Sequence, residues 1–510
     1  MGIFGQKSKI KTAPQTIRVE RVVIPQPQKV SNGSARPTSH PANGANGSLR
    51  VNSSSSNRFA SSSSSLSLNP RITNGARRSA KSASPYPSSA DERRGATATS
   101  MERKRKAVSS TPRDSPAFGD SSDDDDEDGD PFSNRNKRIR RSTSVDVNRR
   151  LRHKKAFSDE ERDPHVIHAA DIASVATNCP PILGAAADEV AVELQYPSRC
   201  KPERYELVWK KDKIDAVKDI LTVVRHVADT YLTEQEAKPF IDHHTSFRRQ
   251  MERAISEKYR DMTAFKTALD SYNKSLRALI ASGSVPRNLD KIHHLPSDLV
   301  AFILDQVYDR TVAPKVELLA KYEMGSDNVY GELLHPFITK ILEQTNMTSD
   351  KVFIDLGSGV GNVVLQAALE IGCRSYGCET MEHPCNLAAA QEKEFRSRCL
   401  LWGVSPGTVY LEKGDIRTSK KILEMLKEAD AILVNNKAFT SGLNDALINM
   451  FLDLKDGCKI ISLKSFVHDN KTAINDVANR ILDVQRYRYH ENWVSWAASE
   501  GEYYISTKKS

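Results

Sequence analysis

Apolar residues recur every three or four positions through the middle of the chain, and this spacing predicts helices with one buried face. Upstream of them, residues 182–207 hold short apolar stretches that read as one or two strands. Together these segments predict a mainly helical N-terminal subdomain over residues 181–313. The predicted helices cover residues 214–231, 247–279 and 299–308.

After Pro314 the pattern changes to short apolar runs that alternate with helical stretches. Such alternation is typical of parallel crossover units, so residues 314–506 are predicted to form an α/β domain with a doubly wound, Rossmann-like sheet. Two β-rich segments near the C-terminus, 493–496 and 503–506, are expected to pair antiparallel at its edge. The predicted parallel strands are 352–356, 374–378, 408–411, 429–434 and 458–463.

The first part of the chain has a different composition. Residues 1–150 carry 27 basic and 14 acidic side chains, a net charge of +13, whereas residues 151–510 carry a net charge of −4. Only five of the 34 aromatic residues fall within 1–150, and Ser, Asn, Ala and Gly dominate residues 30–100. A stretch with so little apolar surface does not offset the entropy of ordering its backbone. We therefore expect residues 1–180 to be a disordered, basic arm.

Several classes of protein are disfavoured by what the sequence lacks. No apolar run approaches the ~18 residues of a membrane span, and the first residues have no apolar core of signal-peptide length. The seven cysteines form no CxxC pair. This pattern favours reduced thiols over disulfides or a zinc site, so we expect neither a metal nor a membrane partner.

Charge blocks within the arm point to its partners. Basic clusters occur at 103–106, 135–141 and 149–155, and an acidic block at 123–130 separates the first two. Basic clusters of this kind are read by nuclear import receptors or neutralise nucleic-acid phosphates. The arm therefore predicts a nuclear protein that contacts DNA, and the acidic block is expected to pair with these basic segments or with basic proteins such as histones.

A glycine loop follows the first predicted strand of the α/β domain, in the sequence from Asp355 to Gly361. A dinucleotide fingerprint requires its third glycine one position later, where Asn362 stands, and no phosphate-loop lysine follows. Glycines allow a close approach of the backbone to a ligand. The spacing thus favours a nucleoside without a pyrophosphate, the alternative being a purely structural turn.

Two acidic residues support the ligand interpretation. Glu379 ends the second predicted strand, 22 residues after Gly357, where a carboxylate can accept both ribose hydroxyls. Asp415 follows the third strand, at a place suited to accept from an adenine amino group. An adenine nucleoside without phosphates, bound in a class I methyltransferase layout, indicates S-adenosylmethionine as the methyl donor.

Five stretches in and around this domain resemble one family. They are similar to the disruptor-of-telomeric-silencing family of nuclear histone H3 lysine methyltransferases, which use this nucleotide-binding fold instead of a SET domain. The resemblance spans about residues 190–506, and it implies methylation, once to three times, of a lysine in the folded core of nucleosomal histone H3. It also implies a role in chromatin silencing and ubiquitylated histone H2B as a further partner. The stretches are 328–332, 355–362, 434–436, 494–496 and 503–504.

The resemblance also assigns roles to individual residues of this chain. The methionine end of the donor would be covered by the segment before the sheet, and the glycine loop would lie beneath it. Glu379 would hold the ribose and Asp415 and Ile416 would frame the adenine, while Asn435 would lie beside the reacting centre and Trp496 and Tyr503 would line the lysine channel. The remaining donor-binding residues would be Tyr330, Gly331, Glu332, Leu333, Phe353, Ile354, Asp355, Leu356, Gly357, Ser358, Gly359, Val360, Gly361 and Asn362.

The reaction expected of such a site is an in-line displacement that requires a neutral amine. Lysine has a pKa of ~10.4, so only about one amine in a thousand is uncharged at neutral pH. No general base stands out, and catalysis is expected from desolvation and alignment. Lys437 departs from the family, which usually has an aromatic residue there, and this cation either opposes the incoming lysine or points to solvent. Methylation of RNA or another substrate, and a weakened chromatin-binding protein, are the alternatives.

Overall fold

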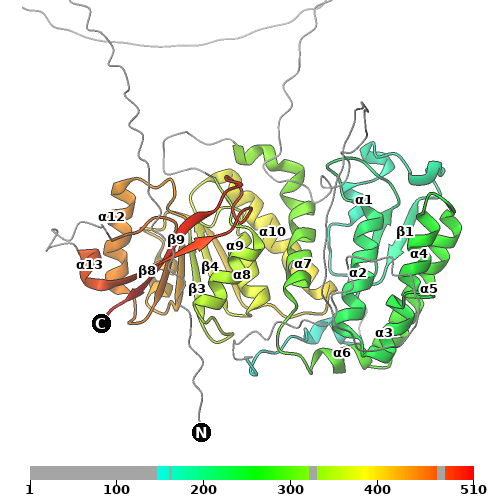
Figure 1. Ribbon diagram of the computed structural model, residues 1–510, viewed down its shortest axis with the longest axis horizontal. Coiled ribbons are helices and arrows are strands. Elements are labelled where there is room, and N and C mark those ends of the chain that lie inside the picture. The colour runs from blue at the N-terminus through cyan, green and yellow to red at the C-terminus, as the bar shows by residue number, and fades with distance from the viewer. Residues whose placement is uncertain (1–145, 160–162, 321–329, 468–476) are drawn as a thin grey trace, which may run out of the picture. The chain divides into compact units, whose positions relative to one another are not determined.

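The computed structural model describes residues 146–159, 163–320, 330–467 and 477–510. A seven-stranded sheet forms the centre of the α/β part of the chain (Figure 1). The order of its strands is β5-β4-β3-β6-β7-β9-β8. Strands β3 to β7 are parallel, while β9 runs antiparallel to β7 and β8 antiparallel to β9. The strands are β3 (Val352–Leu356), β4 (Arg374–Glu379), β5 (Val409–Lys413), β6 (Ala431–Val434), β7 (Lys459–Ser462), β8 (Leu482–Tyr489) and β9 (Gly501–Lys508).

Helices cover both faces of the sheet (Figure 1). All five residues of β3 are buried, as expected of a central parallel strand. Val352 and Ile354 pack in one apolar cluster with α11 and α12, whereas Phe353 faces the opposite side and packs in a second cluster with α8. The helices around the sheet are α8 (His335–Gln344), α9 (Asn362–Glu370), α10 (Glu382–Leu401), α11 (Lys420–Leu426), α12 (Ser441–Met450) and α13 (Val477–Ile481), with the short 3-10 helix η5 (Phe451–Asp453).

The chain changes direction across the sheet between β5 and β6. Strands β4 and β5 are added on one side of β3, and β6 and β7 are added on the other. Leu356 at the end of β3 pairs with Val434 at the end of β6, so the loops that follow these two strands start side by side. In open α/β sheets, ligands bind in the crevice at such a switch point.

The edge of the sheet differs from the expected pairing of 493–496 with 503–506. Strand β9 pairs along its whole length with β8, and residues 493–496 lie in the connection between the two strands. There Val494 forms isolated bridges with Leu333 and Ala497. The expectation was wrong because β8 is an edge strand in which only Leu482 and Tyr489 are buried, which gives it a weak apolar signal.

A helical subdomain precedes the sheet, as the apolar spacing predicts. The single helix predicted over 247–279 is two helices, because the chain turns at Arg260 (φ +47°) and Asp261 caps the next helix by accepting from the Ala264 amide at 2.9 Å. No helix in the described ranges is long and apolar enough to cross a membrane. The elements are α1 (Ala169–Ile172), β1 (Ala191–Leu194), β2 (Glu203–Glu206), α2 (Ala216–Tyr231), α3 (Glu234–Ile241), α4 (Phe247–Ile255), α5 (Met262–Ala281), α6 (Ser284–Leu289) and α7 (Ser297–Thr311), with the 3-10 helices η1 (Lys154–Phe157), η2 (Val175–Thr177), η3 (Ile182–Gly184) and η4 (Ala313–Ala320).

One apolar core joins this subdomain to helices of the sheet. Its buried members extend from Leu151 to Val409 and include residues of α2, α5, α7, α9 and α10. Within it the Tyr231 hydroxyl donates to the Trp402 carbonyl at 2.8 Å. The expected boundary between residues 313 and 314 therefore falls inside a shared core.

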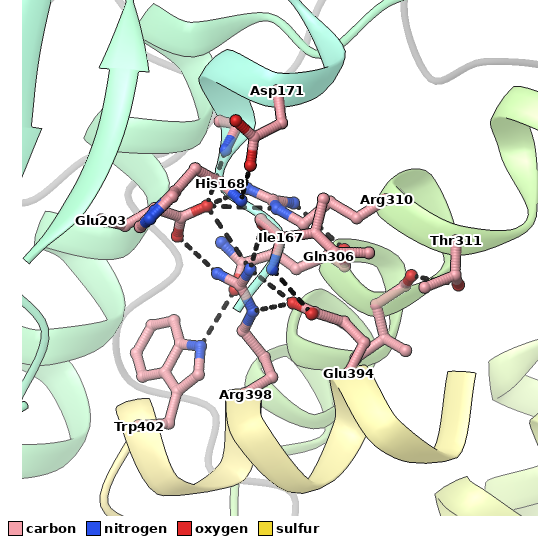
Figure 2. Close-up of polar contacts among 12 residues, drawn as sticks. Ile167, His168, Asp171, Glu203, Gln306, Arg310, Thr311, Glu394, Arg398 and Trp402 are labelled. Carbon is pink, nitrogen blue, oxygen red and sulfur yellow. Dashed lines mark hydrogen bonds and ion pairs between the residues drawn. The ribbon is translucent and has the colours of Figure 1, made fainter. Parts of the chain in front are cut away.

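A buried ionic cluster lies within this shared core (Figure 2). Figure 2 shows Arg310 of α7 and Arg398 of α10 pointing toward the carboxylate of Glu203, which is fully buried. Arg310 Nη2 lies 2.9 Å from Glu203 Oε1, and Arg398 donates to the other oxygen as well as to Glu394, 2.7 Å away. Burial alone would raise the pKa of Glu203, but the two guanidinium groups lower it to about 2.

The folded part begins before residue 180, where the arm was expected to end. Leu151 is buried, and the buried Arg149 side chain donates to the carbonyls of Leu369 at 3.0 Å and Ser405 at 3.2 Å. The basic cluster at 149–155 is thus partly a structural element, which its charge alone did not indicate. The other charge blocks of the arm lie outside the described residues.

Candidate functional site

The loop between β3 and α9 has a backbone that favours glycine at three positions, and at Gly357 φ is +89°. Gly359 and Gly361 have φ of +54° and +89°, a region that other L-residues rarely adopt. A Cβ on Gly359 would lie 2.9 Å from the Tyr330 ring, and one on Gly361 would lie 2.8 Å from the Leu411 side chain. The backbone of the loop therefore stays open toward the crevice.

A cavity of about 500 Å³ opens above this loop at the switch point. Four residues assigned to the donor site do not line it: Phe353, Ile354 and Leu356 lie in the core of β3, and Gly361 begins α9. Residues 328 and 329 of the first family stretch lie outside the described residues. The assigned residues that do line the cavity are Tyr330, Gly331, Glu332, Leu333, Asp355, Gly357, Ser358, Gly359, Val360, Asn362, Glu379, Asp415 and Ile416.

The charges around the cavity suit a cation rather than a phosphate. Its walls carry four carboxyl groups, those of Glu332, Asp355, Glu379 and Asp415, against the single guanidinium of Arg417 among the described residues. Arg417 is already paired with Asp415 at 2.6 Å, and this hydrogen bonding lowers the pKa of Asp415. A polyphosphate would meet net negative charge here, whereas a sulfonium or ammonium group would be attracted.

Glu379 connects the second strand end to the glycine loop. One of its carboxylate oxygens accepts the Gly359 amide at 2.9 Å, and the other accepts the amides of Thr380 and Met381, both at 2.8 Å. These bonds fix the carboxylate at the rim of the cavity. Its orientation is therefore set by the backbone before any ligand contact.

Glu332 and Asp355 are the buried acids of the site. Burial raises the pKa of Glu332 to about 8, and burial together with the neighbouring Glu379 raises the pKa of Asp355 well above its ordinary value. Glu332 accepts hydrogen bonds from the Tyr330 hydroxyl and, at 3.1 Å, from the Asn362 amide. At neutral pH the Glu332 carboxyl of the free protein thus holds a proton, which a bound cation would release.

Asn435 follows β6 and joins the other side of the cavity. Its Nδ2 donates to the Gly331 carbonyl at 3.1 Å, while its Oδ1 is buried and has no hydrogen-bond partner among the described residues. Trp496 packs over Gly331 so closely that a Cβ there would lie 2.6 Å from the indole. An unsatisfied buried acceptor beside an aromatic wall can receive an N–H group of a ligand.

Tyr503 does not lie at the cavity, contrary to the expectation that it lines the lysine channel. Its ring extends from β9 and is buried against α8, 4.9 Å from the Phe337 ring. Its hydroxyl donates to Gln344 of the same helix at 2.5 Å. Burial raises its pKa to about 12. The structure therefore gives Tyr503 a packing role.

The sequence interpretation missed several lining residues, including Arg417, Phe439 and Leu443. Phe439 lies under the glycine loop, where a Cβ on Gly357 would be 3.5 Å from its ring. An aromatic residue shortly after the two asparagines was the available signal. Lys437, by contrast, is exposed and is not part of the lining.

The order of the seven strands, the glycine loop after β3 and the acids at the ends of β4 and β5 define a class I S-adenosylmethionine-dependent methyltransferase. The family model described as "Histone methylation protein DOT1" matches residues 308–508. A Gibberella zeae protein named "Histone-lysine N-methyltransferase, H3 lysine-79 specific" is 57% identical, over 84% of this chain and 87% of its own. The chain belongs to this family of DOT1 histone methylation proteins.

Two further proteins are similar to this chain. A Chaetomium globosum protein of the same name is 58% identical over 73% of each chain. Among solved structures, an RNA methyltransferase from Salinibacter ruber in complex with S-adenosyl-L-homocysteine is similar, with a TM-score of 0.24 and 19% identity over 34% of this chain and 91% of its own.

Proposed function

We propose that this protein transfers methyl groups from S-adenosylmethionine to lysine-79 of histone H3. The observation that carries the proposal is the acidic cavity at the switch point, in a chain that is 57% identical to a relative of that activity. The acidic lining of the cavity supports a cationic methyl donor without phosphates. The family relationship accounts for the acceptor.

The residues around the cavity fit this donor. S-adenosylmethionine supplies a methyl group activated by the positive charge of its sulfonium. Glu379 would accept the ribose hydroxyls, and Asp415 with Ile416 would hold the adenine. Glu332 and Asp355 would offset the positive charge of the methionine end, and the glycine loop leaves the backbone open to it.

Asn435 and Trp496 would receive the lysine. The free Asn435 Oδ1 accepts an N–H of the amine and so orients its lone pair, while the Asn435 Nδ2 bond to Gly331 fixes the side chain. Trp496, which is 36% exposed, supplies an apolar wall that disfavours the ammonium form. In this mechanism the protein aligns and desolvates the amine, and the proton leaves to water.

Lys437 does not oppose this mechanism. Its side chain is exposed and lies outside the cavity lining, so it places no charge in the path of the amine. Phe439 supplies the aromatic surface on this side of the loop. The arrangement favours an active enzyme over a weakened chromatin-binding protein.

The wider setting of the reaction is part of the proposal. A substrate in histone H3 places the protein on the nucleosome and in the nucleus, where import receptors would recognise the basic clusters at 103–106 and 135–141 and the same clusters would contact DNA. We further propose ubiquitylated histone H2B as a partner and chromatin silencing as the process.

The test is methylation with labelled S-adenosylmethionine and three acceptors, nucleosomes, free histones and RNA. We expect label on histone H3 in nucleosomes, and at lysine-79 when its peptides are mapped. Label on RNA alone would replace the proposal with the RNA methyltransferase alternative. Absence of label on all three would support a non-catalytic binding protein.

A further inference from the structure

A groove of about 490 Å³ opens on the helical subdomain, and none of its lining residues belongs to the donor cavity. Its floor is aliphatic: Val217 and Leu221 of α2 and Ile255 of α4 pack against the core but remain partly exposed. Trp209 forms one wall and is 57% exposed. An exposed indole beside open aliphatic side chains is a surface suited to an apolar anchor.

Three basic side chains and one acidic side chain, Asp215, line this groove among the described residues. Lys218 and Arg225 are two turns apart on the same face of α2, and Arg248 comes from α4. Arg225 lies 3.3 Å from Asp298 and Arg248 lies 2.9 Å from Glu252, yet both arginine side chains remain about 40% exposed. Each guanidinium has five N–H donors, so one carboxylate partner does not exhaust it.

One of these donors is unsatisfied. Arg248 Nε is buried and has no hydrogen-bond partner among the described residues. The loop at 210–213 beside Trp209 adds three exposed lysines to the rim against a single aspartate. The groove therefore combines an apolar floor with a rim whose N–H groups can donate hydrogen bonds to carboxylates.

We propose that this groove binds an acidic segment of the chain itself, residues 118–132. This segment has eight acidic side chains and no basic one, with Phe118 and Phe132 at its two ends. A phenyl ring matches the aliphatic floor, and the neighbouring carboxylates match the arginines of the rim. A nucleic acid is a poorer match, because bases stack on aromatic rings and the lining of the groove has one, the Trp209 indole.

The tether favours this occupant. Thirteen residues separate Phe132 from Asp146, where the described part begins, and such a stretch spans up to roughly 45–50 Å. A tether of this length keeps the segment at an effective concentration on the order of 1 mM, so a weak contact suffices. Docking also removes the acidic block from between the basic clusters at 103–106 and 135–141, which leaves both clusters available for phosphates.

Hydroxyl-radical footprinting of the full chain tests the proposal, with the oxidation rate of the Trp209 indole as the readout. Trp496 is an internal reference because it is exposed, lies against Gly331 and does not line this groove. With most molecules docked, we expect Trp209 to oxidise about two- to tenfold more slowly in the wild type than in the variant Phe118→Ser with Phe132→Ser. Raising the salt concentration should reduce the protection, because part of the contact is ionic.

Controls separate the outcomes. Phe59→Ser changes an aromatic residue of the arm outside the acidic segment and should leave the Trp209 rate unchanged. A synthetic peptide of residues 117–133, added to the double variant, should restore the protection. Equal Trp209 rates in the wild type and the double variant would overturn the proposal, as would protection of the variant by duplex DNA but not by the peptide.

Discussion

Replacing Glu203 with Gln tests how strongly the buried ionic cluster stabilises the fold. The change keeps the size of the side chain and removes its charge. Arg310 and Arg398, both almost fully buried, would then lose a shared carboxylate, and each would keep one carboxylate partner, Asp219 at 3.1 Å and Glu394 at 2.7 Å. We expect a large loss of stability without a change of fold.

The magnitude follows from the pKa of Glu203. The carboxyl is buried, which would raise its pKa, yet Arg310 and Arg398 lower it from an ordinary 4.5 to about 2. A difference of this size corresponds to about 3 kcal/mol of stabilisation by the charged form. It agrees with the ~3–5 kcal/mol lost when one partner of a buried ion pair is removed.

The sign of the pH dependence is also fixed. Because the pKa of Glu203 is lowered in the folded state, its contribution is complete above about pH 4.5 and is lost as the pH falls toward about 2. The difference in apparent unfolding free energy between wild type and Glu203→Gln should therefore be about 3 kcal/mol at pH 7 and shrink at acidic pH. Urea unfolding followed by circular dichroism at several pH values measures it.

A matched control lies on the same helix as Arg398. Glu392 pairs with Arg396 on the surface of α10 at 2.5 Å, and Glu392→Gln should cost less than about 1 kcal/mol because exposed pairs contribute little. If Glu203→Gln also cost under about 1 kcal/mol, or if its effect were the same at pH 3 as at pH 7, the cluster would not stabilise the fold in the way argued.

Four further results are expected. Asn435→Ala should lower methylation at least ~100-fold with donor binding retained by calorimetry, and near-normal turnover would exclude its orienting role. Gly331→Ala, whose Cβ would lie 2.6 Å from an indole, should reduce kcat/KM about tenfold, whereas Gly442→Ala, with nothing within 4 Å, should not. Donor affinity should rise with pH up to about 8, where Glu332 loses its proton, and Glu332→Gln should flatten that rise in calorimetry. Deleting residues 101–141 should weaken nucleosome binding and reduce its salt dependence, and an unchanged slope would exclude phosphate contacts by the arm.

The centre of the sheet and the donor cavity were predictable because their signals are local. Strand β3 is a continuous apolar run, the glycine loop follows it directly, and Glu379 and Asp415 stand at the ends of the next two strands. Parallel strands bring such ends to one edge of a sheet. The residues of the site can therefore be located from their positions after the predicted strands, without knowledge of contacts between distant parts of the chain.

The features that the sequence did not reveal depend on distant contacts. Arg149 looks like part of a solvated basic run, but it is buried because carbonyls more than two hundred residues away accept its hydrogen bonds. Tyr503 resembles a channel residue by its place in the motif, yet its side chain packs on the side of Phe337. Alternation along β8 is weak because only its two end residues, Leu482 and Tyr489, are buried.

Helix α10 has a practical consequence for trimming the enzyme. It begins just after Met381 at the donor cavity and carries Arg398 into the ionic cluster. A fragment cut to residues 308–508 would keep Arg398 paired with Glu394 but discard Glu203, and it would expose to water the side of the helix that packs in the shared core. A minimal active fragment should instead start upstream of Asp146, so that the helical subdomain stays joined to the catalytic domain.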